Sequence, residues 1–131
     1  MNEKTVYWLE VAEYDLETAR VVLAGKRYLY VGFMCHQAVE KALKGWVCDK
    51  MVESPPYTHN LALLAQKGGL LSAMTEEQRN FIDVLDPLNI EARYPTHKEK
   101  LLKSLSQERC LKILSQTEEL ISWIKQKLSQ R

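Results

Sequence analysis

The sequence lacks the features that most directly announce a chemical activity. Only 3 cysteines occur among 131 residues, and no two of them form a Cys-x-x-Cys pair. This pattern favours neither a zinc site nor a disulfide framework. Reduced thiols in a cytoplasmic protein are therefore the expected state of Cys35, Cys48 and Cys110.

Long apolar runs and an excess of one charge are also missing. No run approaches the length of a membrane span, and the amino-terminal MNEKTVYWLEVAEYD is too charged for a secretory signal. With 18 Lys and Arg against 17 Asp and Glu, the net charge of +1 gives no global electrostatic case for binding nucleic acid or membranes. We expect a cytoplasmic location and no membrane partner.

Glycine and proline are scarce, at 5 and 4 residues, and the glycines are scattered along the chain rather than gathered in a phosphate-binding loop. Neither the alternating pattern of strands nor an internal repeat is present. The 46% apolar and 27% charged residues are ordinary for a globular protein. We predict one domain over residues 1–131.

Apolar residues recur at helical spacing in about five stretches, which predicts an all-α, up-and-down helical bundle. The first two helices are expected over about residues 5–24 and 28–50, as an antiparallel hairpin. Thr58 or Asn60 caps a short third helix that reaches Gln66 and stops at two glycines.

A capping box, Thr75 with Gln78, opens the fourth helix, which we expect to kink at Pro87 and to stop near Arg93. The last helix is expected over about residues 106–128. Its predicted buried stripe consists of Leu111, Leu114, Leu120, Ile121, Ile124 and Leu128.

His36 and Glu40 are one helical turn apart, a spacing that provides half of a metal site. A di-iron bundle needs Glu-x-x-His pairs, and none of the 3 histidines follows a glutamate in that way. We interpret the two residues as an ordinary surface pair and expect neither metal nor cofactor.

The outer side of the second helix carries two aromatic residues among polar ones. A polar face with two aromatics indicates a covered surface. The cover is either another part of this chain or a partner, and the sequence favours neither. The residues of this face are Tyr30, Phe33, Gln37, Lys41 and Lys44.

Four segments carry a family resemblance, in the same order as in the family. Residues 35–44 read CHQAVEKALK, residues 58–61 read THNL, and residues 92–95 read ARYP. The first helix adds Trp8, Ala12, Asp15, Leu16 and Ala19. Together these segments resemble the HEPN domain, the "higher eukaryotes and prokaryotes nucleotide-binding" family, over about residues 5–125.

The resemblance implies a bundle that dimerises around a shared cleft and works beside a small nucleotidyltransferase, often as a toxin–antitoxin pair. Active members are metal-independent ribonucleases in which an Arg and a His from each protomer meet in the cleft. Carried onto this sequence, the candidate catalytic residues are Arg93 and His97. The candidate nucleotide-binding residues are Gln37, Lys41, Lys44, His59, Arg93 and Tyr94.

The spacing of the candidate pair departs from the family pattern. Three residues separate Arg93 from His97, against four to six in active members, and Pro95 interrupts the segment. One hypothesis is therefore a nucleotide- or RNA-binding ribonuclease, and the alternative is a non-catalytic module that presents substrate to the nucleotidyltransferase. The third hypothesis is a helical adaptor that binds no nucleotide.

Structural roles are also open for two of the candidates. Arg93 can stabilise the carboxyl end of a helix, and His59 can be a loop or capping residue.

Overall fold

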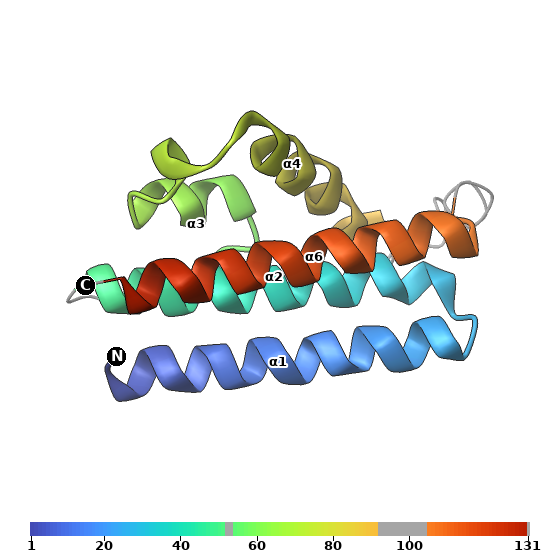
Figure 1. Cartoon of the computed structure of the whole chain (residues 1–131), viewed down its shortest axis with the longest axis horizontal. Coiled ribbons are helices and arrows are strands. Elements are labelled where there is room, and N and C mark those ends of the chain that lie inside the picture. The colour runs from blue at the N-terminus through green and yellow to red at the C-terminus, as the bar shows by residue number, and fades with distance from the viewer. Residues whose placement is uncertain (52–53, 92–104, 131) are drawn as a thin grey trace.

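The structure, a computed structural model, describes residues 1–51, 54–91 and 105–130. Within these ranges it contains five α-helices, one 3₁₀ turn and no strand, so the prediction of an all-α helical bundle is confirmed (Figure 1). The elements are α1 (Glu3–Ala24), α2 (Tyr28–Lys50), α3 (Leu61–Lys67), η1 (Leu71–Ala73), α4 (Glu76–Glu91) and α6 (Gln107–Ser129).

The α1 and α2 helices form the predicted antiparallel hairpin. Asn2 caps α1, because its Oδ1 accepts the Thr5 N–H at 2.8 Å. Small residues keep the two helices close: a Cβ on Gly45 would meet the Thr5 carbonyl oxygen at 3.4 Å. Ala12 and Ala38 are fully buried. Helix backbones approach closely where side chains at the crossing are this small.

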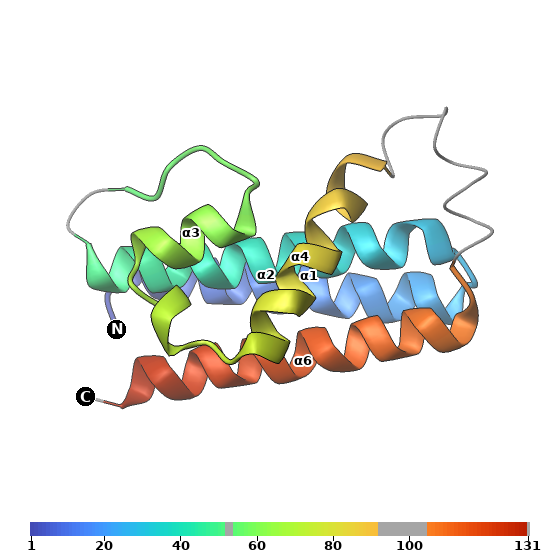
Figure 2. The same ribbon diagram turned by 90° about the horizontal axis from the view of Figure 1, so that it is seen from above.

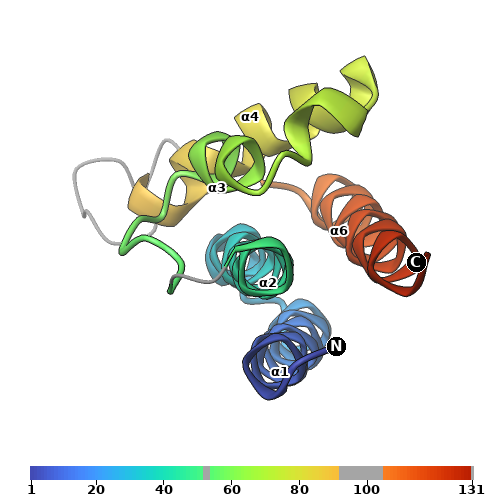
Figure 3. The same cartoon turned by 90° about the vertical axis from the view of Figure 1, so that its left-hand side faces the viewer.

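The last helix, α6, packs along α2 and touches α1 (Figure 3). Five of its six predicted core residues are buried, but Leu111 is 51% exposed, so that part of the prediction was wrong. The buried stripe of α6 begins instead with Cys110. It continues with Ile113 and Thr117, which follow at intervals of three and four residues. Leu111 points away because it lies one position, or about 100°, from Cys110 around the helix.

The α3 and α4 helices cover the side of α2 that faces away from α1, as Figures 2 and 3 show. Asn60 caps α3 through Leu63 N–H, and Thr75 and Gln78 form the reciprocal capping box of α4, as predicted. The Trp46 indole donates a hydrogen bond to the Gly68 carbonyl at 2.8 Å.

The α4 helix continues through Pro87 and crosses over α2 (Figure 2). A Cβ on Gly32 would meet Leu88 Cδ1 at 2.6 Å, so glycine permits this close crossing. The predicted stop near Arg93 lies outside the described residues.

The three cysteines are free and buried. Burial raises the pKa of the Cys35 thiol to about 12. Among the helices described, none combines the length and the apolar character needed to cross a membrane.

Candidate functional site

Polar residues line part of the middle of α2, a helix that lies between α1 on one side and α3 and α4 on the other (Figure 3). Helical spacing aligns these polar residues, since residues three or four apart share a face. His36 and Glu40 are 0% and 1% exposed, which is rare for ionisable side chains without partners. We call this set the polar strip of α2: His36, Gln37, Glu40, Lys41 and Lys44.

Glu40 is the centre of the strip. One carboxylate oxygen lies 2.7 Å from Nδ1 of His59, and the other accepts a hydrogen bond from Lys44 Nζ at 3.1 Å. Burial alone raises the pKa of a carboxylate, but the hydrogen bonds from His59 and Lys44 outweigh it and lower the pKa of Glu40. Glu40 is therefore an ionised carboxylate held inside the fold.

The ionised state of Glu40 determines the tautomer of His59. A carboxylate only accepts hydrogen bonds, so Nδ1 of His59 must carry the hydrogen. The lone pair of the neutral ring then sits on Nε2. The His59 side chain is 57% exposed, so this histidine is both oriented by a carboxylate and open to solvent. An imidazole held in this way can accept or donate a proton at Nε2.

His36 joins the same strip to α4. Its Nε2 lies 3.1 Å from Oδ1 of Asp86, and the same oxygen accepts the Leu61 N–H at 3.3 Å. Burial lowers the pKa of His36, against the opposing effects of Asp86 and Glu40, so the ring is held neutral. Nδ1 is buried without a hydrogen-bond partner in the described structure.

Lys41 and Gln37 form a second chain of contacts. Lys41 Nζ lies 3.4 Å from Asp15 of α1 and donates to Gln37 Oε1 at 3.0 Å. The Gln37 amide donates in turn to Oδ1 of the buried Asn89 of α4 at 2.9 Å. Burial raises the pKa of Asp15, although Lys41 opposes the shift. This chain connects α1, α2 and α4.

Two interpretations from the sequence were wrong here. His36 and Glu40 do not form a surface pair, because both are buried and each has a partner from another segment. Lys44 does not lie on an outer face either: it is 8% exposed, and its Nζ sits 5.4 Å from the centre of the Trp8 ring. Within the described residues, Asn89 of α4 covers Gln37 of this face, whereas Tyr30 is 47% exposed.

The structure therefore brings four of the predicted nucleotide-binding residues to the polar strip or its edge, namely Gln37, Lys41, Lys44 and His59. The charges of Lys41 and Lys44 are compensated by Asp15 and Glu40. The remaining candidates, Arg93, Tyr94 and His97, lie outside the described residues.

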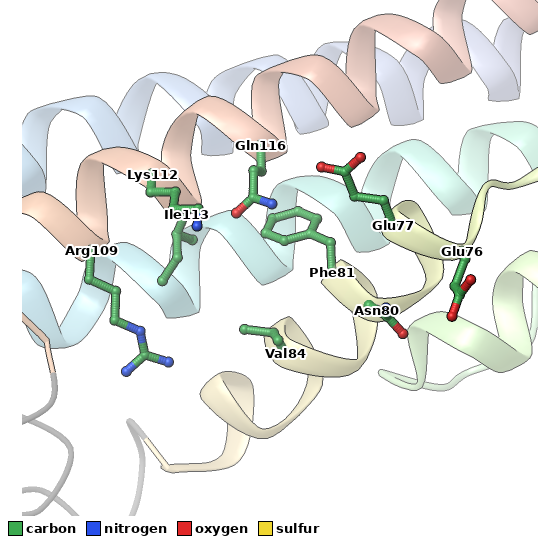
Figure 4. Close-up of a pocket in the computed structure, with 9 residues that line it drawn as sticks. All are labelled: Glu76, Glu77, Asn80, Phe81, Val84, Arg109, Lys112, Ile113 and Gln116. Carbon is green, nitrogen blue, oxygen red and sulfur yellow. The ribbon is translucent and has the colours of Figure 1, made fainter.

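A groove between α4 and α6 contains functional candidates that the sequence interpretation missed (Figure 4). Its volume is about 730 Å³. Arg109 and Lys112, one helical turn apart in the first turns of α6, line one end, and Glu76 and Glu77 line the other. In the sequence, the three-residue spacing of Arg109 and Lys112 directly after the predicted start of the last helix could have identified them as a cationic pair. The groove is completed by Asn80, Phe81, Val84, Ile113 and Gln116.

Metal ligands are not gathered in the part of the chain that the structure describes. No group of three or more His, Cys, Asp or Glu side chains is arranged there to hold an ion. The side chains of the polar strip and of the groove can form hydrogen bonds, transfer protons and bind anions.

Comparison with known proteins gives a family and a fold. The HEPN domain family matches residues 5–128. TT1696 from Thermus thermophilus is 21% identical, with a TM-score of 0.82 over 96% of this chain and 99% of that one. ST0689, an archaeal HEPN homologue, is 19% identical, with a TM-score of 0.74 over 98% and 100%. No curated protein matches the sequence significantly.

Proposed function

Because the chain belongs to the HEPN domain family, we propose that it binds a nucleotide or RNA as a homodimer that works with a small nucleotidyltransferase. Family membership supports a nucleotide- or RNA-related function, and HEPN domains often act as dimers. Beyond that family-level function, we propose a ligand site, a nucleotidyltransferase partner and specific residues that contact the phosphate.

The observation that carries the proposal is the cationic end of the α4–α6 groove. Arg109 and Lys112 line it, and they come from the helix that directly follows the segment with Arg93 and Tyr94 in the sequence. Two cations one helical turn apart suit a phosphate group, and the amino-terminal turn of a helix adds a favourable dipole. From the family resemblance we also propose Arg93 as a phosphate-binding residue, because its planar guanidinium suits bidentate contact with phosphate oxygens.

Two activities are compatible with the proposed binding of a nucleotide or RNA. In a toxin-type, metal-independent ribonuclease, His97 takes the proton of a ribose 2′-hydroxyl, and Arg93 clamps the phosphate as negative charge develops. In the non-catalytic alternative, the protein holds the ligand for the nucleotidyltransferase. The short Arg93–His97 spacing, with Pro95 between them, favours this alternative, because proton transfer needs closely positioned groups.

Anisotropy of a fluorescently labelled oligoribonucleotide tests the binding. A charge-assisted contact contributes about 1.5–3 kcal/mol, so Arg93→Ala is expected to weaken binding roughly tenfold to a hundredfold. Arg93→Lys restores only part of it, since an ammonium lacks the bidentate fork. The control is Arg20→Ala, a half-exposed arginine on α1, which leaves binding unchanged.

The outcomes separate the hypotheses. If Arg93→Ala binds RNA as well as the wild type but unfolds at a lower temperature, Arg93 has only a structural role. Cleavage of RNA by the wild type, abolished in His97→Ala with binding intact, identifies the ribonuclease, and binding without cleavage identifies the non-catalytic module. A strict monomer in light scattering at high micromolar concentration contradicts the dimer.

A further inference from the structure

The outer face of α1 is a second surface with an unusual composition. α1 lies at the edge of the bundle, on the side of α2 away from α3 and α4 (Figure 3). Tyr7, Tyr14 and Val21 follow one another at intervals of seven residues and are 59%, 72% and 69% exposed. A seven-residue interval places side chains along nearly one line of a helix, as in helices that pair with another helix.

Acidic residues flank this apolar line. Glu3, Glu10 and Glu17 repeat at the same interval, four residues before the apolar ones. Two of them, Glu10 and Glu17, line a groove of about 460 Å³ that α1 forms together with Lys125 of α6. The groove residues are Met1, Val6, Leu9, Glu10, Glu13, Tyr14, Glu17 and Lys125.

The charges of the groove are only partly compensated within the chain. Glu13 forms an ion pair with Lys125 of α6. Glu10 and Glu17 make no ion pair with any residue that the structure describes, and both are exposed. The groove therefore offers an apolar contact beside two uncompensated carboxylates.

The glutamates of this face argue against three kinds of binding partner: nucleic acid, a membrane and a second copy of the chain. Phosphate groups of nucleic acid are repelled by carboxylates. Helices that lie on membranes carry Lys and Arg beside their apolar face, and here glutamates occupy those positions. Two copies paired through this face about a two-fold axis would bring like charges together.

We propose that the acidic face of α1, formed by Val6, Glu10, Glu13, Tyr14 and Glu17, docks a basic amphipathic helix of another protein. The apolar side chains of that helix lie against Tyr14 and Val6, and its Lys or Arg residues pair with Glu10 and Glu17. Such helix-in-groove recognition uses apolar anchors at heptad spacing and flanking charges for specificity. The surface is separate from the α4–α6 groove, and the inference holds whether or not the chain binds RNA.

A designed helical peptide of about 20 residues, with leucine at heptad positions and lysine beside them, is the probe. Titration calorimetry is expected to show binding that weakens with added salt. The double variant Glu10→Lys/Glu17→Lys weakens it at least about tenfold, which corresponds to 1.4 kcal/mol. Tyr14→Ala weakens it severalfold through the apolar contact.

The matched control is Glu77→Lys/Glu119→Lys, which changes the net charge equally at two residues that do not line the α1 groove. Equal weakening by this control would show general charge attraction and overturn the proposal. Unchanged binding of the α1 variants overturns it as well. A loss of self-association in those variants, measured by light scattering, would identify a second copy as the occupant instead.

Discussion

The imidazole of His59 and the carboxylate of Glu40 meet at 2.7 Å, although they are 19 residues apart in the sequence. This contact fastens the segment before α3 to the centre of α2, and Lys44 holds the opposite oxygen of the same carboxylate. One buried charge thus organises side chains that the family signature places in two separate motifs.

Replacing Glu40 by Gln is expected to lower the free energy of unfolding by about 1–3 kcal/mol, because buried polar partners lose a charged acceptor. A carboxylate whose pKa is lowered in the folded state stabilises the protein above its unfolded pKa of about 4.5. This stability is lost as the pH falls through the lower, folded pKa. Urea unfolding of both proteins between pH 7 and pH 3 measures it; an equal acid dependence in Glu40→Gln contradicts the prediction.

His36 is expected to titrate below its usual value of 6.5. A histidine with a lowered pKa binds fewer protons in the folded state, so its contribution to stability is present at high pH. It is lost as the pH falls below 6.5 toward the folded pKa. Histidine ring signals followed by NMR over pH give the value directly, with His36→Gln to assign the signal. A pKa at or above 6.5 would show that Asp86 and Glu40 outweigh burial.

Substitution of Gly68 by Ala is expected to destabilise the protein by about 1–3 kcal/mol, as overpacking does. The new Cβ would lie 2.4 Å from Cδ1 of the rigid Trp46 indole. The control is Gly25→Ala, where the nearest atom lies at an ordinary 3.5 Å. Thermal unfolding compares them, and equal melting temperatures would show that Trp46 moves aside freely.

Removal of both groove cations in Arg109→Ala/Lys112→Ala is expected to weaken oligoribonucleotide binding roughly tenfold or more. It also reduces the dependence of affinity on salt, since fewer phosphates are neutralised. The control Lys4→Ala/Arg20→Ala removes the same charge from α1, at residues that do not line the groove. If both double variants lose the same affinity, the groove is not the binding site.

Much of the fold was predictable because its signals are local. Capping by Asn60 and by the Thr75–Gln78 pair involves residues within three positions of each other, so a single sequence displays it. Helical periodicity also located the first two helices, expected over about residues 5–24 and 28–50 and found at Glu3–Ala24 and Tyr28–Lys50. The stripe of α6 was misplaced at Leu111 because a run of apolar residues leaves the edge of a stripe undefined, and packing against α2 decides it.

The polar strip was predictable in its residues but not in its burial. Charged side chains are rarely buried without partners, which made a surface position for Glu40 and Lys44 the natural expectation. The partners that permit burial are His59 and Asp86, and they approach only when α3 and α4 fold over α2. Such contacts between distant segments leave no periodic signal in one sequence. The same holds for Arg109 and Lys112, which gain a site only opposite α4.

The burial of all three cysteines makes the molecule convenient for site-specific labelling. Alkylating reagents react with thiolates, and burial raises the pKa of Cys35, Cys48 and Cys110, so each is protonated at neutral pH. A cysteine introduced at an exposed position outside both binding surfaces, such as Val21 on α1 or Ser115 on α6, then reacts first with the native thiols left in place. Fluorophores at these two positions, each in its own variant, report on the two surfaces while the residues proposed to bind stay unchanged.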